Sequence, residues 1–205
     1  MMISAIVLAA GISRRMGRPK MTLRWGEITV IGQVVSVLVR SGLQEIMVVT
    51  GGAQHQVETA LQDFPVDCVF NPGYSENEMM GSLQTGLSAL SGDVNAAMVV
   101  LGDQPCIQEQ VVERLFEAYA GTQADLIVPS YLMQRGHPWI VARSLWPEIM
   151  NLNPPETLRN FMKDHAEKIH YVSVNTATIL GDIDTPGDYE NQRPVDSHND
   201  SIDLS

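Results

Sequence analysis

Cysteine is scarce in this sequence, and long apolar runs are missing. The two cysteines, Cys68 and Cys106, lie far apart in the chain, and no apolar run approaches the roughly 20 residues that span a bilayer. The apolar start has no preceding basic region of the kind that a signal peptide carries. We therefore expect a cytoplasmic protein with two reduced thiols and no association with a membrane.

Positive charge is also in short supply. The 205 residues contain 13 Lys and Arg against 24 Asp and Glu, which gives a net charge of −11. Such a surface repels nucleic acid, whose partners usually present a basic face. A hydrophobic content of 44% is nevertheless ordinary for a globular protein with a real core. We therefore expect a compact protein that does not bind nucleic acid.

Short apolar runs alternate with segments of helical periodicity. Alternation of this kind predicts parallel strands with helices packed on both faces, which is a doubly wound, mostly parallel α/β sheet. Ligands bind such sheets beyond the carboxyl ends of the strands. The predicted strands are 4–10, 45–51, 66–70, 96–105, 125–131, 136–142 and 169–174, and the predicted helices are 30–42, 54–64, 80–92, 109–121 and 155–165.

The alternation also suggests how the chain is organised. Residues 1–190 read as a single domain, and the polar residues 191–205 as a flexible tail. The stretch 131–153 interrupts the strict alternation and is a plausible insertion that shapes a second binding pocket.

A glycine loop follows the first predicted strand. Gly11 allows backbone N–H groups to approach a ligand closely, and Ser13 adds a hydroxyl. Five of the 13 basic residues lie within the eleven positions 14–24, which in an acidic protein favours a polyanionic ligand. The patterns of the P-loop and of the dinucleotide fingerprint are both absent. The alternative is a solvated basic loop without a ligand.

The segment "LAAGISRRMGRPK" resembles the glycine loop of the MobA-like nucleotidyltransferases, which include the molybdenum cofactor guanylyl- and cytidylyltransferases. The resemblance implies a Rossmann variant like that of the nucleotide-diphospho-sugar transferases, with an NTP-binding N-terminal half and an acceptor side at about 131–170. It places Arg15 and Lys20 on the triphosphate, and Ala10 favours CTP over GTP. The nucleotide-binding residues that it implies in the loop are Leu8, Ala9, Ala10, Gly11, Ser13, Arg15 and Lys20.

Carboxylates occur at two places where a metal could be held. Asp103 follows the most apolar strand, in the sequence "GDQP", and Mg²⁺ prefers carboxylates together with phosphate oxygens. From the residues alone, Asp103 could equally cap a turn before Pro105. The resemblance includes "GDQP" and makes Asp103 a metal ligand and a catalytic residue.

The second acidic cluster is "DIDTPGD". Here Thr185 is the expected helix cap, with Asp188 in the first turn. We select Asp184 as the second metal ligand, with Asp182 as the second choice, and place Asp182 with the acceptor-side residues.

The remaining candidates lie in two loops. The resemblance implies that Ser82 contacts the nucleotide, although Ser82 could instead be a helix N-cap. It places Arg135, Gly136 and His137 on the acceptor side, although a lone histidine is more often structural.

Together these features predict a Mg²⁺-dependent nucleotidyltransferase in which Arg15, Lys20 and Asp103 are catalytic. The resemblance implies transfer of CMP, or less readily GMP, from an NTP to the phosphate of molybdopterin, and a molybdoenzyme or a maturation factor as a possible partner. Two alternatives remain open: another phosphorylated acceptor such as a sugar phosphate, and a non-catalytic protein that carries the pterin cofactor. The presence of Lys20, Asp103 and Asp184 together argues against a carrier.

Overall fold

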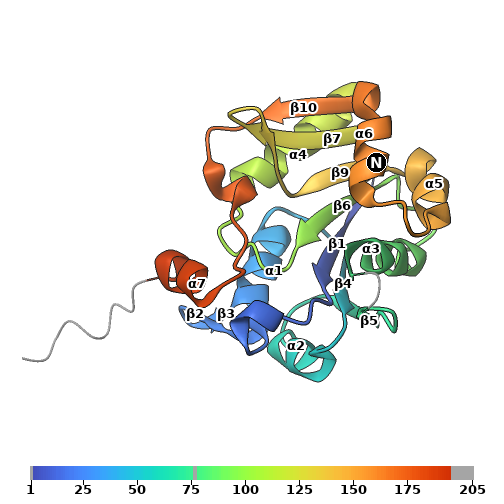
Figure 1. Cartoon of the computed structure of the whole chain (residues 1–205). Coiled ribbons are helices and arrows are strands. Elements are labelled where there is room, and N and C mark those ends of the chain that lie inside the picture. Colours follow the sequence, from blue (N-terminus) through green and yellow to red (C-terminus); the bar gives the residue numbers. More distant parts are fainter. Residues whose placement is uncertain (1, 76–77, 195–205) are drawn as a thin grey trace, which may run out of the picture.

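An eight-stranded sheet forms the centre of the computed structural model, which describes residues 2–75 and 78–194 (Figure 1). Its strands lie in the order β10-β7-β9-β6-β1-β4-β5, and β8 pairs with β7. The strands are β1 (Ile3–Ala9), β4 (Ile46–Thr50), β5 (Asp67–Phe70), β6 (Ala96–Leu101), β7 (Leu126–Tyr131), β8 (Gln134–Arg135), β9 (Trp139–Ala142) and β10 (Ile169–Ser173).

Helices cover both faces of this sheet. One hydrophobic cluster joins the strands to α1, α2 and α4, and a second joins them to α3, α5 and α6. The prediction of a doubly wound, mostly parallel α/β fold is therefore confirmed. The helices are α1 (Val30–Arg40), α2 (Gln54–Ala60), α3 (Glu78–Ala89), α4 (Glu109–Thr122), α5 (Trp146–Asn151), α6 (Leu158–Asp164) and α7 (Pro186–Gln192).

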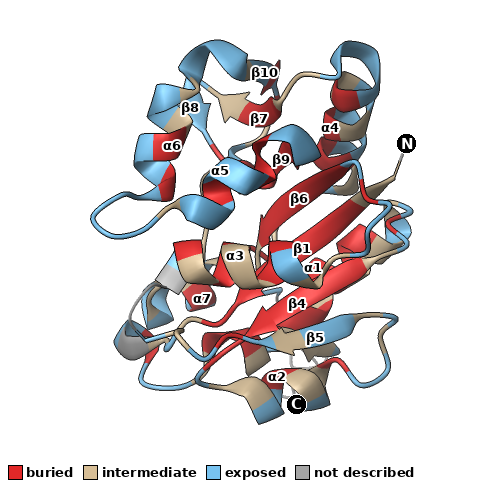
Figure 2. Cartoon of the chain, turned by 90° about the vertical axis from the view of Figure 1, so that its right-hand side faces the viewer, coloured by how far each residue is buried: buried red, intermediate tan, exposed pale blue. Residues whose placement is uncertain are grey.

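The first strand shows why its sequence is apolar throughout. Residues of β1 alternate between the two clusters, so that Ala5 and Val7 face α1 and α4 while Ile6 and Leu8 face α3. A strand covered on both faces has no polar side, and the interior strands are accordingly buried in Figure 2. The same reasoning explains β4 and β6, whose residues are almost all buried.

Part of the sheet departs from the predicted pattern. Strand β9 lies between β6 and β7 and is antiparallel to both. This direction was not predicted, because the periodicity of a buried strand carries no information about it. A hairpin of two short strands, β2 (Arg24–Trp25) and β3 (Ile28–Thr29), was also not predicted. It turns at Gly26, which has a φ of 61°. Two-residue strands are too short to show a period.

The C-terminal boundary also differs from the prediction. Helix α7 continues to Gln192, past the boundary expected at 190, and residues 195–205 of the predicted tail lie outside the described residues.

Among the described helices, none is both long enough and apolar enough to cross a membrane.

The parallel core determines which loops meet. Strands β4, β1 and β6 are adjacent and parallel, and β7 runs the same way because β9 is antiparallel to both β6 and β7. The loops that follow these four strands therefore lie along one edge of the sheet. The glycine loop after β1 and Asp103 after β6 are neighbours at this edge.

Gly86 tests how tightly α3 packs against the sheet. A methyl group at this position would lie 2.4 Å from Ile6 Cγ2 and 3.1 Å from Val49 Cγ2. We expect Gly86→Ala to lower the free energy of unfolding by about 1–2 kcal/mol, because overpacking outweighs the gain in helix propensity. The measurement is thermal or urea unfolding followed by circular dichroism.

Gly121 in α4 provides the control. A methyl group there meets no heavy atom within 4 Å, so Gly121→Ala should leave stability unchanged or raise it by up to about 1 kcal/mol. Equal stability of Gly86→Ala and the parent protein would contradict the close packing of α3.

Candidate active site

The glycine loop folds back on itself before it reaches Lys20. Ser13 and Gly17 adopt left-handed conformations, with φ values of 55° and 66°, on either side of a short 3-10 helix, Arg14–Met16. The backbone N–H of Lys20 donates to Ser13 Oγ at 3.1 Å. This bond holds the start of a second 3-10 helix, Lys20–Thr22, against the loop. The side chain of Lys20 is only 10% exposed as a result.

Asp103 is held beside this loop by the preceding glycine. The N–H of Gly102 donates to the carbonyl of Leu8 at 3.0 Å, which extends the pairing of β6 with β1. A Cβ atom on Gly102 would lie 2.9 Å from Ile31 Cδ1 and 3.1 Å from that carbonyl oxygen. A glycine is therefore needed for β6 to deliver Asp103 to the loop after β1.

The segment 182–184 reaches the same place from the end of the chain. The N–H of Ile183 donates to the carbonyl of Asp103 at 2.9 Å, and the side chain of Ile183 is fully buried. It packs in a small cluster beside the glycine loop. The cluster consists of Met16, Leu23, Trp25, Val30, Ile183 and Tyr189.

The two aspartates that flank Ile183 lie together with Asp103. One ligand atom from each of Asp103, Asp182 and Asp184 lies within 4.8 Å of the others. Residues two apart in an extended segment share a face, which explains why Asp182 lies with Asp184 while Ile183 is buried in the cluster. Asp182, expected on the acceptor side and as the second choice for the metal, lies among the three candidate ligands.

Helix α7 begins immediately after these carboxylates and fixes their backbone. Thr185 Oγ1 accepts from the N–H of Asp188, and Asp188 Oδ2 accepts from the N–H groups of Thr185 and Asp184 at 2.7 and 3.2 Å. The predicted cap at Thr185 and Asp188 is therefore confirmed as a capping box. The hydrogen bonds from Thr185 lower the pKa of Asp188.

Two cations of the glycine loop pair with the carboxylates. Lys20 Nζ contacts Asp103 Oδ2 and lies 3.0 Å from Asp184 Oδ1. Arg15 lies 2.6 Å from the other oxygen of Asp184. Only Arg15, whose side chain is 68% exposed, is largely in solvent.

Burial and ion pairing act against each other on the pKa values of these groups. Burial would lower the pKa of Lys20, but Asp103 and Asp184 outweigh it and the pKa is raised. Burial raises the pKa of Asp103 despite the opposing effect of Lys20. Slight burial acts in the same sense on Asp184, but Lys20 and Arg15 outweigh it and lower its pKa. Lys20 is therefore protonated at neutral pH, and its charge is balanced locally.

The charged groups surround a cavity of about 280 Å³. Oxygen ligands of this kind suit a hard divalent cation such as Mg²⁺ or Mn²⁺, and the spacing of the three carboxylates allows them to share one ion. The cavity is lined by Leu8, Ala10, Gly11, Arg15, Lys20, Met21, Met79, Ser82, Leu101, Asp103, Asp182 and Asp184.

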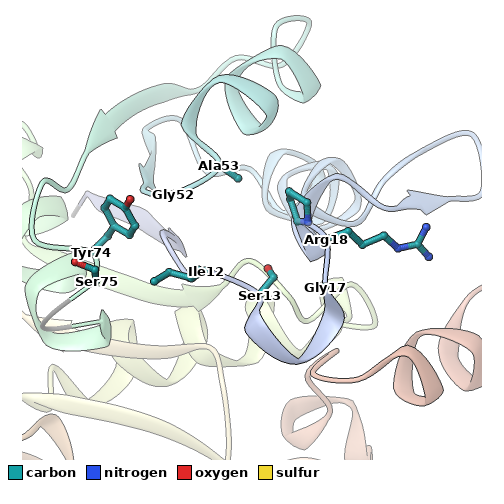
Figure 3. Close-up of a pocket in the computed structure, with 10 residues that line it drawn as sticks. Ile12, Ser13, Gly17, Arg18, Gly52, Ala53, Tyr74 and Ser75 are labelled. Atoms are coloured by element: carbon teal, nitrogen blue, oxygen red, sulfur yellow. The ribbon is translucent and has the colours of Figure 1, made fainter.

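A second cavity, of about 410 Å³, lies on the β4 and β5 side of the glycine loop. Figure 3 shows Ile12, Gly52, Ala53 and Tyr74 around it, with the guanidinium of Arg18 pointing away. The sequence analysis did not select Gly52, Ala53 or Tyr74. Their place immediately after β4 and β5, at the carboxyl edge, was the signal that could have identified them.

The predicted nucleotide-binding Ser82 lines the first cavity and is almost fully buried. Its Oγ accepts from Asn71 Nδ2 at 3.1 Å. Helix α3 begins at Glu78, so Ser82 lies inside the helix. The alternative of an N-cap at Ser82 is therefore wrong.

The predicted acceptor-side residues point in different directions. Arg135 is exposed and lies over the ring of Tyr171, 5.3 Å from its centroid. A Cβ atom on Gly136 would lie 2.3 Å from the carbonyl oxygen of Ile179, and the N–H of His137 donates to the same oxygen at 2.9 Å. Burial lowers the pKa of His137 to about 4, so its ring is neutral at physiological pH. Arg135, Gly136 and His137 line neither of these two cavities, whereas Asp182 lines the first.

Comparison with known families bears directly on this site. The model of the MobA-like NTP transferase domain matches residues 5–169. The chain belongs to this family. The match covers the glycine loop, Lys20 and Asp103, whereas Asp182 and Asp184 lie beyond it. A nucleotidyltransferase of this family uses an NTP, which agrees with a cationic loop opposite carboxylates.

Individual relatives of this MobA-like NTP transferase are distant. It is 26% identical to the molybdenum cofactor cytidylyltransferase of Escherichia coli over 91% of this chain and 93% of that protein. Among solved structures, Rv0371c of Mycobacterium tuberculosis has a TM-score of 0.81 at 26% identity, covering 93% of this chain and 97% of the other. Another structure of that protein contains manganese. A nucleotidyl transferase of Methanothermobacter has a TM-score of 0.78 at 26% identity, covering 94% and 96%.

The capping box makes a pH-dependent prediction. The pKa of Asp188 is lower in the folded protein than in the unfolded chain, so its contribution to stability is present above the unfolded pKa and is lost as the pH falls through the folded one. We expect Asp188→Asn to have a lower Tm than the parent protein at pH 7, with the two values converging as the pH falls through the lowered pKa of the carboxyl group and the group becomes protonated.

The control for this measurement is Asp63→Asn, at an exposed position between α2 and β5. Its Tm should follow that of the parent protein at every pH. A difference between Asp188→Asn and the parent that stays constant as the pH falls from 7 through the range in which the carboxyl group becomes protonated would contradict the role of the charged carboxylate.

Proposed function

We propose that the protein transfers CMP from CTP to the phosphate of a molybdopterin-type acceptor and releases pyrophosphate. The observation that carries the proposal is that a cationic glycine loop and three carboxylates meet in one cavity. The choice of acceptor is supported by the similarity to the cytidylyltransferase of E. coli along most of both chains. The choice of CTP is supported by Ala10, which lines the first cavity next to Gly11, the residue that lines both cavities.

The two cavities together suit a nucleotide. Gly11 lines both of them, so one ligand can extend from the first into the second. We place the phosphates beside Lys20, and the base and ribose in the cavity of Figure 3, against Tyr74. The first cavity alone, at about 280 Å³, is slightly smaller than the usual range for small-molecule sites, whereas the two cavities together fall within that range.

Asp103, Asp182 and Asp184 fit a divalent cation, which supplies positive charge shared between the phosphates when it is bound. The related protein Rv0371c forms a complex with manganese. We therefore propose a Mg²⁺ or Mn²⁺ requirement, with Asp182 added to the pair of ligands expected from the sequence.

The chemistry requires little covalent work from the protein. A phosphate oxygen of the acceptor attacks the α-phosphorus of CTP, a new P–O bond forms, and the bond to the departing pyrophosphate breaks. Arg15 and Lys20 stabilise the negative charge that grows on the pyrophosphate. A phosphate dianion is already a nucleophile near neutral pH, so no side chain needs to remove a proton. Two of the three carboxylates of the cavity, Asp103 and Asp184, are in any case engaged with cations.

Pyrophosphate release tests the proposed function. With Mg²⁺ and molybdopterin as acceptor, we expect CTP to give the fastest release, and we expect Asp103→Asn to reduce kcat/KM at least about 100-fold through loss of a charged ligand. Asp93→Asn, at an exposed position, is the control and should retain parental activity. Release with a sugar phosphate alone would indicate a different acceptor. Binding of the pterin without release from any NTP would indicate a carrier.

Ala10 provides a test of base selection. A Cβ atom on Gly51 would lie 2.4 Å from the carbonyl oxygen of Ala10 and 2.9 Å from its Cβ, so the backbone of the next loop already lies against this methyl group. We expect Ala10→Gly to reduce the ratio of kcat/KM for CTP over GTP about tenfold, since one methyl group in a pocket discriminates by roughly that factor. An unchanged ratio in steady-state assays would show that selection lies elsewhere.

A further inference from the structure

The residues expected to bind phosphate are bound to the residues expected to bind metal. The ammonium of Lys20 contacts Asp103 Oδ2 and lies 3.0 Å from Asp184 Oδ1, and Arg15 takes the other oxygen of Asp184. Under the proposed function these four groups belong to two different ligands. Without those ligands they neutralise one another.

We propose that Lys20 closes the metal site of the nucleotide-free protein, so that the divalent cation and the triphosphate bind in a coupled manner. The inference rests on the proposed function for the identity of the two ligands. A cation that enters between Asp103 and Asp184 competes with the ammonium of Lys20 for the same oxygens. A phosphate group in the cavity offers that ammonium a new partner.

Lys20 is suited to this task and Arg15 is not. The side chain of Lys20 is 10% exposed, and its backbone N–H is bonded to Ser13 Oγ. Because this side chain is mostly buried, moving its ammonium from the carboxylates into water costs more than it does for an exposed group. Arg15 is 68% exposed and can exchange its carboxylate partner for water at little cost. Lys20, rather than Arg15, is therefore the group that competes with a metal ion for the carboxylates.

The coupling has a thermodynamic consequence in both directions. A phosphate that takes Lys20 away from Asp103 and Asp184 raises their affinity for a divalent cation. By linkage, the cation raises the affinity for the phosphate by the same factor. The free protein should then bind Mn²⁺ more weakly than three clustered carboxylates would otherwise allow.

The test is Mn²⁺ binding to the nucleotide-free protein, measured by electron paramagnetic resonance of free Mn²⁺ and by calorimetry. We expect Lys20→Met, which keeps the apolar stem and removes the ammonium, to bind Mn²⁺ at least about tenfold more tightly than the parent protein, because a cation 3 Å from the ligand oxygens no longer competes. Circular dichroism establishes that the variant is folded, and Lys20→Gln replaces it if it is not.

Arg24→Met is the matched control. It removes one positive charge from the same stretch of chain, but Arg24 is exposed and contacts Gly26 and Glu27 instead of the carboxylates of the cavity. Its Mn²⁺ affinity should equal that of the parent protein. Equal or weaker binding by the Lys20 variant, or equal tightening in Arg24→Met, would overturn the proposal.

The two proposals fail separately in this experiment. Mn²⁺ binding to the free protein requires neither an NTP nor an acceptor. Tightening in the Lys20 variant without pyrophosphate release by the parent protein would leave the closed metal site standing and remove the proposed activity. Release without tightening would do the reverse.

Discussion

The hydrogen bond from the N–H of Ile183 to the carbonyl of Asp103 joins the two acidic segments on which the site depends. It is made possible by the burial of Ile183 in a cluster that also contains Met16 of the glycine loop. One apolar side chain therefore anchors the carboxylates of 182 and 184 to both Asp103 and the cationic loop. The apolar cluster determines the distances between opposite charges, whereas the charges alone would not determine a geometry.

Local charge balance distinguishes this edge from the rest of an acidic protein. The chain has a net charge of −11, yet Arg15 and Lys20 offset two of the three carboxylates in the cavity. Partly buried ions are costly unless they are paired. Here the ion pairs hold Arg15 and Lys20 beside Asp103 and Asp184, whereas a cluster of charges of one sign would repel itself. The same pairing explains how groups of opposite charge remain together in this cavity.

The sequence predicted those features that arise from local periodicity and from the order of elements. Apolar runs and glycine stops identified the longer strands and the helices α1 to α4 and α6, but not α5 or β8. The position of Asp103 after β6 followed from the same pattern. The antiparallel direction of β9 could not be predicted, because a strand buried on both faces has the same composition in either direction. Contacts between Lys20 and the carboxylates, and the cavity beside Tyr74, depend on loops distant in sequence. Only the assembled fold brings these loops together.

Strand β9 divides the functional edge of the sheet into two parts with different architectures. Strand β9 lies between β6 and β7, which are therefore two strand spacings, or about 10 Å, apart. Because β9 is antiparallel to both, the chain enters β9 at this edge, through residues 136–138, and leaves it at the opposite edge. On the β1 and β4 side, by contrast, each strand leads directly into a loop and a helix. The segments at this edge therefore fall into two sets. The loops after β1, β4, β5 and β6 contribute residues to the two cavities, whereas residues 136–138, which lead into the antiparallel strand, line neither cavity.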